Sequence, residues 1–391
     1  MAYRLSKPHQ GLPLRVTLAL SIILASVCLL ATRSPPSLAS GIAVRQQAFP
    51  VGRVSNFRAV PKTGLRSASR EVAVRDSLEV EVDSKGRERL AFKEDGWKTW
   101  NWKGHNINYI QSGDKGTPIV LVHGFGAHAY HWRYQIPELS KNHRVYSLCL
   151  LGYGWSDKAP DAPYSAEFWG NQVSSFMQEV IGEGAVLVGN SIGAVTALSA
   201  ASSTPDLVKG LVMVNAAGRF GDMAPDATGD PGANPEPEVE ASGPLDALKD
   251  FVTDGFASLI FYSTRFRIPL ILKQVYLDRD QVDEPLVKSI TAPALDPMAL
   301  QTFQSIYRAP GRGRATVNQM MRRLPQSMKV LLLWGQQDPW MQPEKADQIM
   351  KVCDEQGLEC EYVPLVAGHC PQDDNPKDLN DNLVRWVNTH F

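Results

Sequence analysis

Residues 186–194 read Val-Leu-Val-Gly-Asn-Ser-Ile-Gly-Ala, and this stretch decides the fold of the 391-residue chain. Three apolar residues lead into the pattern Gly-x-Ser-x-Gly, and small and apolar residues follow over 195–201 with helical spacing. The order predicts a strand, a sharp turn and a helix, with Ser191 at the apex of the turn. Gly189 and Gly193 leave room for a tight turn that larger side chains would block. A serine raised above a sheet edge in this way is a candidate nucleophile, and a turn without chemistry is the alternative.

Strand-like and helix-like segments alternate on both sides of this turn. Apolar runs typical of strands occupy 119–122, 145–150, 207–215, 329–334 and 359–364. Helical patterns follow them at 129–139, 166–181, 343–356 and 378–390. Ahead of them, residues 100–110 alternate like two strands around a turn at Lys103 and Gly104. Strands that alternate with helices predict an α/β protein with a mostly parallel, doubly wound sheet.

The alternation stops at Gly218. Residues 221–243 are rich in Gly, Pro, Asp and Glu, which predicts a mobile loop. Residues 245–325 carry helix-like segments with many large apolar and aromatic side chains, so we expect an inserted helical cap. The predicted organisation is a targeting presequence at 1–70, a linker at 71–96, a first part of the core at 97–218, the mobile loop and helical cap at 219–326, and a second part of the core at 327–391.

Charge separates the first 70 residues from the rest. They contain ten Lys and Arg and no Asp or Glu, so the remaining residues carry 30 basic against 41 acidic side chains, a net charge of −11. An acidic folded part argues against nucleic acid as a partner.

The N-terminal residues have the composition of a targeting segment. A 17-residue apolar run, 16–32, lies between Arg15 and Arg33, and Ser37-Leu38-Ala39 suits signal cleavage. Residues 40–70 have transit-peptide composition. A signal-like part followed by a transit-like part resembles the bipartite presequence of algae with complex plastids, which implies a plastid (chloroplast) location. A plain secretory signal and a retained single-pass anchor are the alternatives.

Three candidate catalytic residues follow separate strands. Ser191 ends one strand, Asp338 comes shortly after the strand 329–334, and His369 comes shortly after the strand 359–364. The C-terminal ends of parallel strands meet at one edge of the sheet, where open α/β sheets bind ligands. His369 would accept the Ser191 proton, and Asp338 would orient the imidazole and stabilise its charge. The alternatives are a helix cap for Asp338 and a loop role for His369.

The same geometry predicts an oxyanion hole. The sequence His-Gly-Phe-Gly at 123–126 ends the strand 119–122 and faces the turn at Ser191. The backbone amides of Phe125 and Ile192 can point at a developing oxyanion, and losing one such donor typically costs about 10²–10³ in rate. An ordinary glycine turn is the alternative here, and His123 is expected to brace the loop.

This chemistry calls for no metal and no organic cofactor. The chain has five cysteines, and neither a disulfide-scaffold spacing nor a CxxC pair occurs. The cluster Cys353, Cys360, His369 and Cys370 therefore lacks the spacing of a zinc site.

From about residue 97 onward the chain resembles the α/β-hydrolase superfamily, and within it the plastid chlorophyll dephytylase and pheophytinase group. The matching stretches are 120–127, 131–133, 150–158, 186–193, 207–215 and 367–374. The resemblance implies removal of phytol from chlorophyll-type pigments by ester hydrolysis. It also implies a hydrophobic ester as partner, with chlorophyll or pheophytin as examples, and a peripheral thylakoid association as an open expectation. Cys149 stands where such relatives usually carry Asp.

Serine rather than aspartate at the turn argues against the chemistry of haloalkane dehalogenases and most epoxide hydrolases of this fold. A serine hydrolase acting through an acyl-enzyme is expected. A plastid carboxylesterase or lipase, a C–C bond hydrolase and a non-catalytic ligand-binding protein on the same scaffold remain as alternatives.

Overall fold

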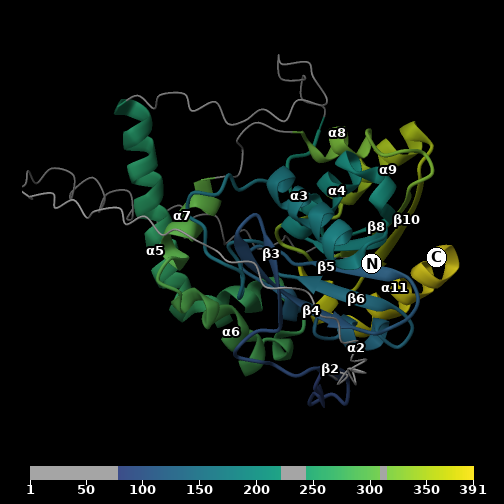
Figure 1. Ribbon diagram of the computed structural model, residues 1–391, viewed down its shortest axis with the longest axis horizontal. Helices are drawn as coiled ribbons and strands as arrows, with labels where there is room; N and C mark the ends of the chain where they lie inside the picture. The colour runs from purple at the N-terminus through teal and green to yellow at the C-terminus, as the bar shows by residue number, and fades with distance from the viewer. Residues whose placement is uncertain (1–77, 222–243, 309–314) are drawn as a thin grey trace, which may run out of the picture. The chain divides into compact units, whose positions relative to one another are not determined.

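The computed structural model describes residues 78–221, 244–308 and 315–391. Its main sheet contains β3 (Lys98–Trp102), β4 (His105–Ser112), β5 (Pro118–Val122), β6 (Arg144–Leu148), β7 (Ala185–Asn190), β8 (Val208–Val214), β9 (Lys329–Gly335) and β10 (Glu359–Leu365). The strand order is β10-β9-β8-β7-β5-β6-β4-β3 (Figure 1). β4 runs antiparallel to β3 and β6, and the other pairs are parallel. The predicted mostly parallel sheet is confirmed. The predicted presequence, residues 71–77 of the predicted linker and all but Gly221 of the loop predicted at 221–243 lie outside the described residues.

Helices cover both faces of the sheet (Figure 1). One face carries α3 (Ala166–Phe176), extended by the single turn η2 (Met177–Ile181), together with α4 (Ile192–Ser203), α8 (Val317–Met321) and α9 (Glu344–Gln356). The other carries η1 (Ala129–Trp132), α2 (Gln135–Leu139), α10 (Pro371–Asp374) and α11 (Pro376–His390). The short turn η3 (Pro205–Leu207) leads into β8.

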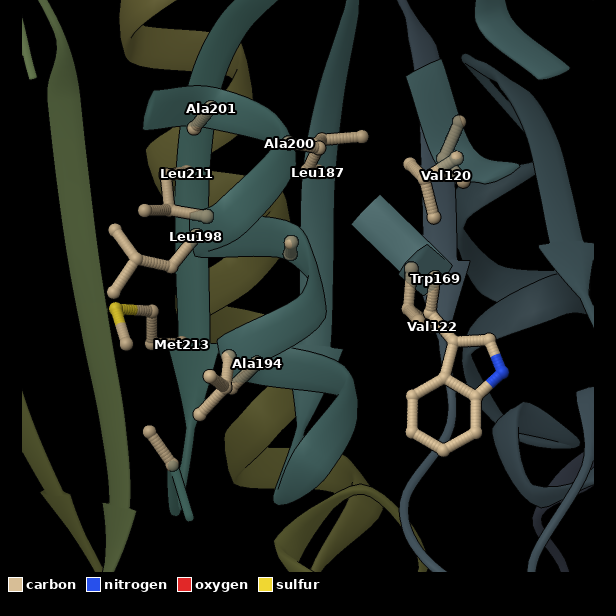
Figure 2. Close-up of a cluster of buried hydrophobic side chains, with 14 of the residues drawn as sticks. Val120, Val122, Trp169, Leu187, Ala194, Leu198, Ala200, Ala201, Leu211 and Met213 are labelled. Atoms are coloured by element: carbon tan, nitrogen blue, oxygen red, sulfur yellow. The ribbon is translucent and has the colours of Figure 1, made fainter. Parts of the chain in front are cut away.

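Each central strand contributes to two hydrophobic cores, because successive side chains point to opposite faces of a sheet. On β7, Leu187 packs in the core beside α3 and α4, whereas Val186 and Val188 pack in the core beside α2 and α11. Figure 2 shows the first core, where small residues of α4 such as Ala200 let the helix lie close to the sheet. Burial on both faces accounts for the unbroken apolar runs of the sequence.

The inserted helical cap lies between β8 and α8 in the chain, so it ends earlier than the predicted bound, because α8 packs on α4 and α9 in the core. It consists of α5 (Pro244–Val275), α6 (Glu284–Thr291) and α7 (Ala299–Arg308), with the short turns η4 (Arg279–Gln281) and η5 (Pro293–Leu295). α5 contacts both α6 and α7. Among the described residues, no helix combines the length and the apolar character needed to cross a membrane.

The segment expected to be a linker, 71–96, differs from the prediction. It contains a hairpin of β1 (Val80–Val82) and β2 (Glu88–Leu90), and Leu90 is buried in the core. Two of its charged side chains are paired: Lys85 with Asp278 of the cap, and Arg89 with Asp283 of the cap. The buried Leu90 and these long-range ion pairs thus attach a stretch predicted to be a linker.

Candidate active site

Ser191 forms the turn between β7 and α4. Its backbone has φ 57° and ψ −121°, a conformation that non-glycine residues rarely adopt and that costs on the order of 1–3 kcal/mol. Two of its backbone hydrogen bonds reach outside the turn: the Ser191 N–H donates to the Val214 carbonyl at 3.0 Å, and the Ala217 N–H donates to the Ser191 carbonyl at 3.1 Å. The end of β8 and the segment after it thus fix the serine at the edge of the sheet.

Glycine is required where the chain passes closest to this turn. A Cβ at Gly193 would lie 2.3 Å from the Val122 carbonyl oxygen, so any side chain there would push α4 away from β5. A Cβ at Gly124 would lie 3.2 Å from the Ser191 Cβ. The loop after β5 therefore lies directly against the serine turn.

Asp338 and His369 form a buried pair. His369 Nδ1 lies 2.6 Å from Asp338 Oδ2, and that oxygen also accepts a bond from the Asn215 side-chain amide at 2.7 Å. The Trp340 N–H donates to Asp338 Oδ1 at 2.7 Å. Burial opposes ionisation of Asp338, but the hydrogen bond and charge of His369 and the backbone donors outweigh it and lower the pKa of the carboxyl. An ionised Asp338 can hold a proton on Nδ1 and leave Nε2 free to act as a base.

Backbone contacts fix the position of His369. Its N–H donates to the Val275 carbonyl at the end of α5 at 2.8 Å, and its carbonyl accepts a bond from the Asn190 side chain at 3.1 Å. The ring also lies against Trp340, with centroids 5.0 Å apart. The histidine is therefore held between the core and the cap.

One cavity brings three of the predicted site residues together, whereas Asp338 reaches it through His369 and Ile192 is not part of its lining. It has a volume of about 360 Å³ and is lined by Ser191, His369 and Phe125. The cap supplies an apolar wall of Phe261, Ile268, Ile271, Leu272, Val275, Ile290, Phe303 and Ile306. Among the lining residues, Lys158 is the one Lys, Arg, Asp or Glu; its Nζ donates to the carbonyls of Gly154 and Ser156 at 2.6 and 2.8 Å, and burial lowers its pKa. The cavity thus suits a largely apolar ligand.

The loop of the predicted oxyanion hole is braced as expected. His123 Nδ1 contacts the Gly124 carbonyl at 2.8 Å, and Nε2 accepts the Leu150 N–H at 3.0 Å, so both ring nitrogens are engaged. Burial lowers the pKa of His123 to about 3, which keeps the ring neutral. Phe125 packs its ring on Phe303 of the cap, and Ile192 is the first residue of α4, where backbone N–H groups lack intrahelical acceptors.

A buried ionic network joins two of the motifs found in the sequence. Arg133 binds Asp373 at 2.6 Å and Asp283 of the cap at 2.8 Å. Tyr276 donates to Asp373 at 2.9 Å, and His131 Nε2 lies 2.8 Å from the Tyr276 hydroxyl. Burial opposes the Arg133 charge, but the two carboxylates outweigh it and raise the pKa of Arg133 well above its usual range. The network ties the cap to the segment that follows His369.

The sequence prediction missed Asn215, Asn190 and Trp340. Asn215 accepts the Gly335 N–H at 2.8 Å and has a positive φ of 41°, so it joins β8, β9 and the acid. The sequence signal that could have found Asn215 is an asparagine at the end of a predicted strand, followed by small residues. Within the described residues, no group of His, Cys, Asp and Glu is placed to hold a metal ion.

The fold has counterparts among known proteins. The model of the alpha/beta hydrolase family matches residues 119–382, so the chain belongs to that family. Among curated proteins, it is similar to the chloroplastic pheophytinase of Arabidopsis thaliana, at 28% identity over 72% of this chain and 64% of that protein. The chain thus spans less than two thirds of that relative.

Another curated protein and a solved structure are also similar to this chain. The 2-hydroxymuconate semialdehyde hydrolase of Pseudomonas sp. (strain CF600) is 27% identical over 60% of this chain and 75% of that protein. The solved structure of a serine hydrolase involved in carbazole degradation has a TM-score of 0.58 at 21% identity, covering 76% of this chain and 100% of that chain. The last likeness shows the shared fold.

Proposed function

We propose that the chain is a serine hydrolase that cleaves the phytyl ester of chlorophyll-type pigments in the plastid. The proposal rests on the arrangement of three side chains. Ser191, in a strained backbone conformation, lines the same apolar cavity as His369, and Nδ1 of His369 is hydrogen-bonded to Asp338. A ligand-binding protein without catalysis needs neither the strain nor the buried pair.

The first half-reaction forms the acyl-enzyme. His369 Nε2 takes the hydroxyl proton of Ser191 as the oxygen attacks the ester carbonyl. The amides of Phe125 and Ile192 donate to the negative oxygen that develops. His369 then gives the proton to the phytol oxygen, and the ester C–O bond breaks.

The second half-reaction releases the pigment acid. A water molecule gives a proton to His369 and attacks the acyl carbon, and the same two amides hold the oxyanion. The proton returns to the Ser191 oxygen as the bond to the acyl group breaks. Asp338 stays ionised throughout and stabilises the imidazolium form of His369.

The cap supports the choice of substrate. Its wall of the cavity is built from aliphatic and aromatic side chains, which favour a long hydrocarbon chain. Burial contributes about 0.8 kcal/mol for each CH₂, so a twenty-carbon phytyl chain can dominate affinity even when partly buried. The similarity to a pheophytinase points to the same class of ester.

The location proposed is the plastid, reached through the presequence 1–70. The support is the composition of that segment and the chloroplastic location of the Arabidopsis relative. Fusing residues 1–70 to a fluorescent protein should direct it to the plastid of an alga with complex plastids. Fluorescence confined to the secretory pathway or the medium would overturn this part of the proposal. Peripheral association with the thylakoid belongs to the same proposal, and flotation with thylakoid vesicles tests it.

The substrate is tested by its products. Purified protein is incubated with detergent-solubilised chlorophyll a, pheophytin a and short acyl esters, and phytol and the pigment acid are separated by chromatography. We expect phytol release that Ser191→Ala abolishes. Protein that cleaves a short ester but releases no phytol from any pigment would contradict the pigment assignment and leave the serine hydrolase. Protein that cleaves neither and resists fluorophosphonate labelling would contradict both.

A C–C bond hydrolase is the second candidate, because the similarity to the semialdehyde hydrolase covers 60% of the chain. Adding 2-hydroxymuconate semialdehyde to the panel distinguishes the two. Consumption of this compound at a higher kcat/KM than any phytyl ester would favour the C–C bond reaction.

A further inference from the structure

Asp374, the last residue of α10, binds three backbone amides that belong to two different parts of the molecule. Its Oδ2 accepts the N–H of Gly368 at 2.6 Å and the N–H of Leu277 at 2.9 Å. Its Oδ1 accepts the N–H of Asp278 at 2.7 Å. Gly368 immediately precedes His369, whereas Leu277 and Asp278 follow the cap helix α5. One buried carboxylate thus joins the histidine loop to the end of α5.

A direct backbone bond runs beside this carboxylate. The His369 N–H donates to the Val275 carbonyl, and a Cβ at Gly368 would lie 2.0 Å from that same oxygen. The two backbones therefore touch with no side chain between them. Val275 also lines the cavity, so a residue of the cavity wall is hydrogen-bonded to the backbone of the proposed base.

We propose that Asp374 is a positioning residue that sets His369 against Asp338 by clamping the histidine loop to the end of α5. The proposal rests on the serine hydrolase function proposed above. Asp374 does not touch the cavity; it acts on catalysis through the backbone of Gly368. A misplacement of about 1 Å in a catalytic group can cost about 10²-fold in rate, so the loss of this clamp reduces kcat.

Asp283 offers a matched control. It is also a carboxylate that joins cap and core, but its partners are Arg133 and Arg89, and the N–H of Leu286 at the start of α6. Asp283 makes no hydrogen bond in the structure to Gly368 or His369. Asp374→Ala and Asp283→Ala therefore remove the same group from two cap–core contacts. Only Asp374 accepts a hydrogen bond from Gly368 in the loop of His369, whereas Asp283 reaches α10 through Arg133 and Asp373.

The test measures kcat and KM on a short ester and a long-chain ester, together with the rate of fluorophosphonate labelling at Ser191. We expect Asp374→Ala to lower kcat on both esters by about ten- to a hundredfold and to slow labelling by a similar factor. Asp283→Ala should keep kcat on the short ester within about twofold and raise KM for the long one. Asp374→Asn retains one acceptor oxygen for Gly368 and Leu277, and should recover most of the lost kcat.

Hydrogen exchange supplies a readout that does not depend on activity. In Asp374→Ala, the amides of Gly368, Leu277 and Asp278 should exchange faster together, while the melting temperature shows whether the protein is folded. Unchanged kcat and labelling in folded Asp374→Ala would overturn the proposal, as would an equal kcat loss in Asp283→Ala. Should Asp374→Ala fail to fold, Asp374→Asn is measured in its place. If this variant has wild-type stability and its Gly368 amide exchanges faster than in the wild type while kcat is unchanged, the proposal is overturned too. Wild-type protein inactive on all esters and unlabelled would instead contradict the hydrolase function, with the exchange result still deciding whether the clamp exists.

Discussion

At the scale of single residues, the proposed mechanism depends on three side chains that act together. Ser191→Ala, Asp338→Ala and His369→Ala should each lower kcat for ester hydrolysis by roughly 10⁴-fold or more, because each removes the same activated nucleophile. Double variants should be little worse than single ones. The measurement is steady-state turnover of a model ester, with circular dichroism to show that each variant folds. Near-normal turnover by Ser191→Ala would refute the assignment.

Asn215 is the residue that links the acid to the sheet, and its loss should be felt in stability as well as rate. Asn215→Ala leaves the Gly335 N–H and one bond to Asp338 unmade, and unmade buried bonds cost about 1–3 kcal/mol. Urea denaturation measures the change.

Asn215→Gly is the matched control for this prediction. Glycine tolerates the positive φ of this position, so the difference between the two variants reports backbone strain, and the remainder reports the lost amide. Both variants unfolding like the wild type would show that the amide contributes nothing.

At the scale of elements, α5 is the helix that should set the preference for chain length. Ile268, Ile271 and Leu272 of this helix line the cavity beside Ser191. Each added CH₂ that enters the cavity should raise kcat/KM by roughly fourfold, from about 0.8 kcal/mol of burial, until the cavity is full. A series of esters that differ only in chain length measures this.

Ile271→Ser provides the control for the series, because it places a hydroxyl on the apolar wall without touching the triad. It should flatten the dependence on chain length and leave the rate on the shortest ester nearly unchanged. Equal kcat/KM for acetate and long-chain esters in the wild type would contradict a hydrocarbon site.

At the scale of the whole molecule, buried histidines should make the fold sensitive to mild acid. Burial lowers the pKa of His123 to about 3, and burial with the nearby Arg133 charge lowers the pKa of His131 to about 3. In the unfolded chain both titrate near about 6.5. Between these values the unfolded state binds more protons, so stability is full above about pH 6.5 and falls as the pH drops toward 3.

Urea midpoints between pH 8 and pH 5 test this prediction, since carboxylates contribute little there. The free energy of unfolding, obtained from these urea curves, should change with pH by about 1.4 kcal/mol per pH unit for each histidine in the lower part of this range. His131→Gln should reduce the slope, because glutamine does not titrate. A midpoint that stays constant down to pH 5 would rule the effect out.

The parts of the fold and of the candidate site that could be predicted are those whose residues lie close together in the sequence. The turn at Ser191 and the strands around it are short-range patterns, and the predicted fold class is confirmed. The structure also brings Asp338 and His369 within hydrogen-bond distance, as their places after two neighbouring strands suggest. The pairing of Arg133 with Asp373 could not be foreseen, because 240 residues separate them and a motif does not state its partner.

The same limit explains why the hairpin β1–β2 was predicted to be a linker. Lys85 and Arg89 look solvated in the sequence because their partners, Asp278 and Asp283, lie in the cap nearly 200 residues away. Neither composition nor periodicity carries information about such contacts. Short motifs can therefore be recognised in the sequence, whereas the ion pairs between distant segments cannot.

The hairpin β1–β2 also bears on the proposed removal of the presequence 1–70. It holds Leu90 in the core, and Lys85 in its turn and Arg89 on β2 are paired with carboxylates of the cap, so a cut within 80–90 would remove contacts that attach the cap. A peptidase that trims one residue at a time from the presequence would meet hydrogen-bonded backbone at Val80 and slow there. Under this proposal the folded protein, rather than a sequence that the peptidase recognises, sets the N-terminus that remains, as a ragged end just ahead of the hairpin.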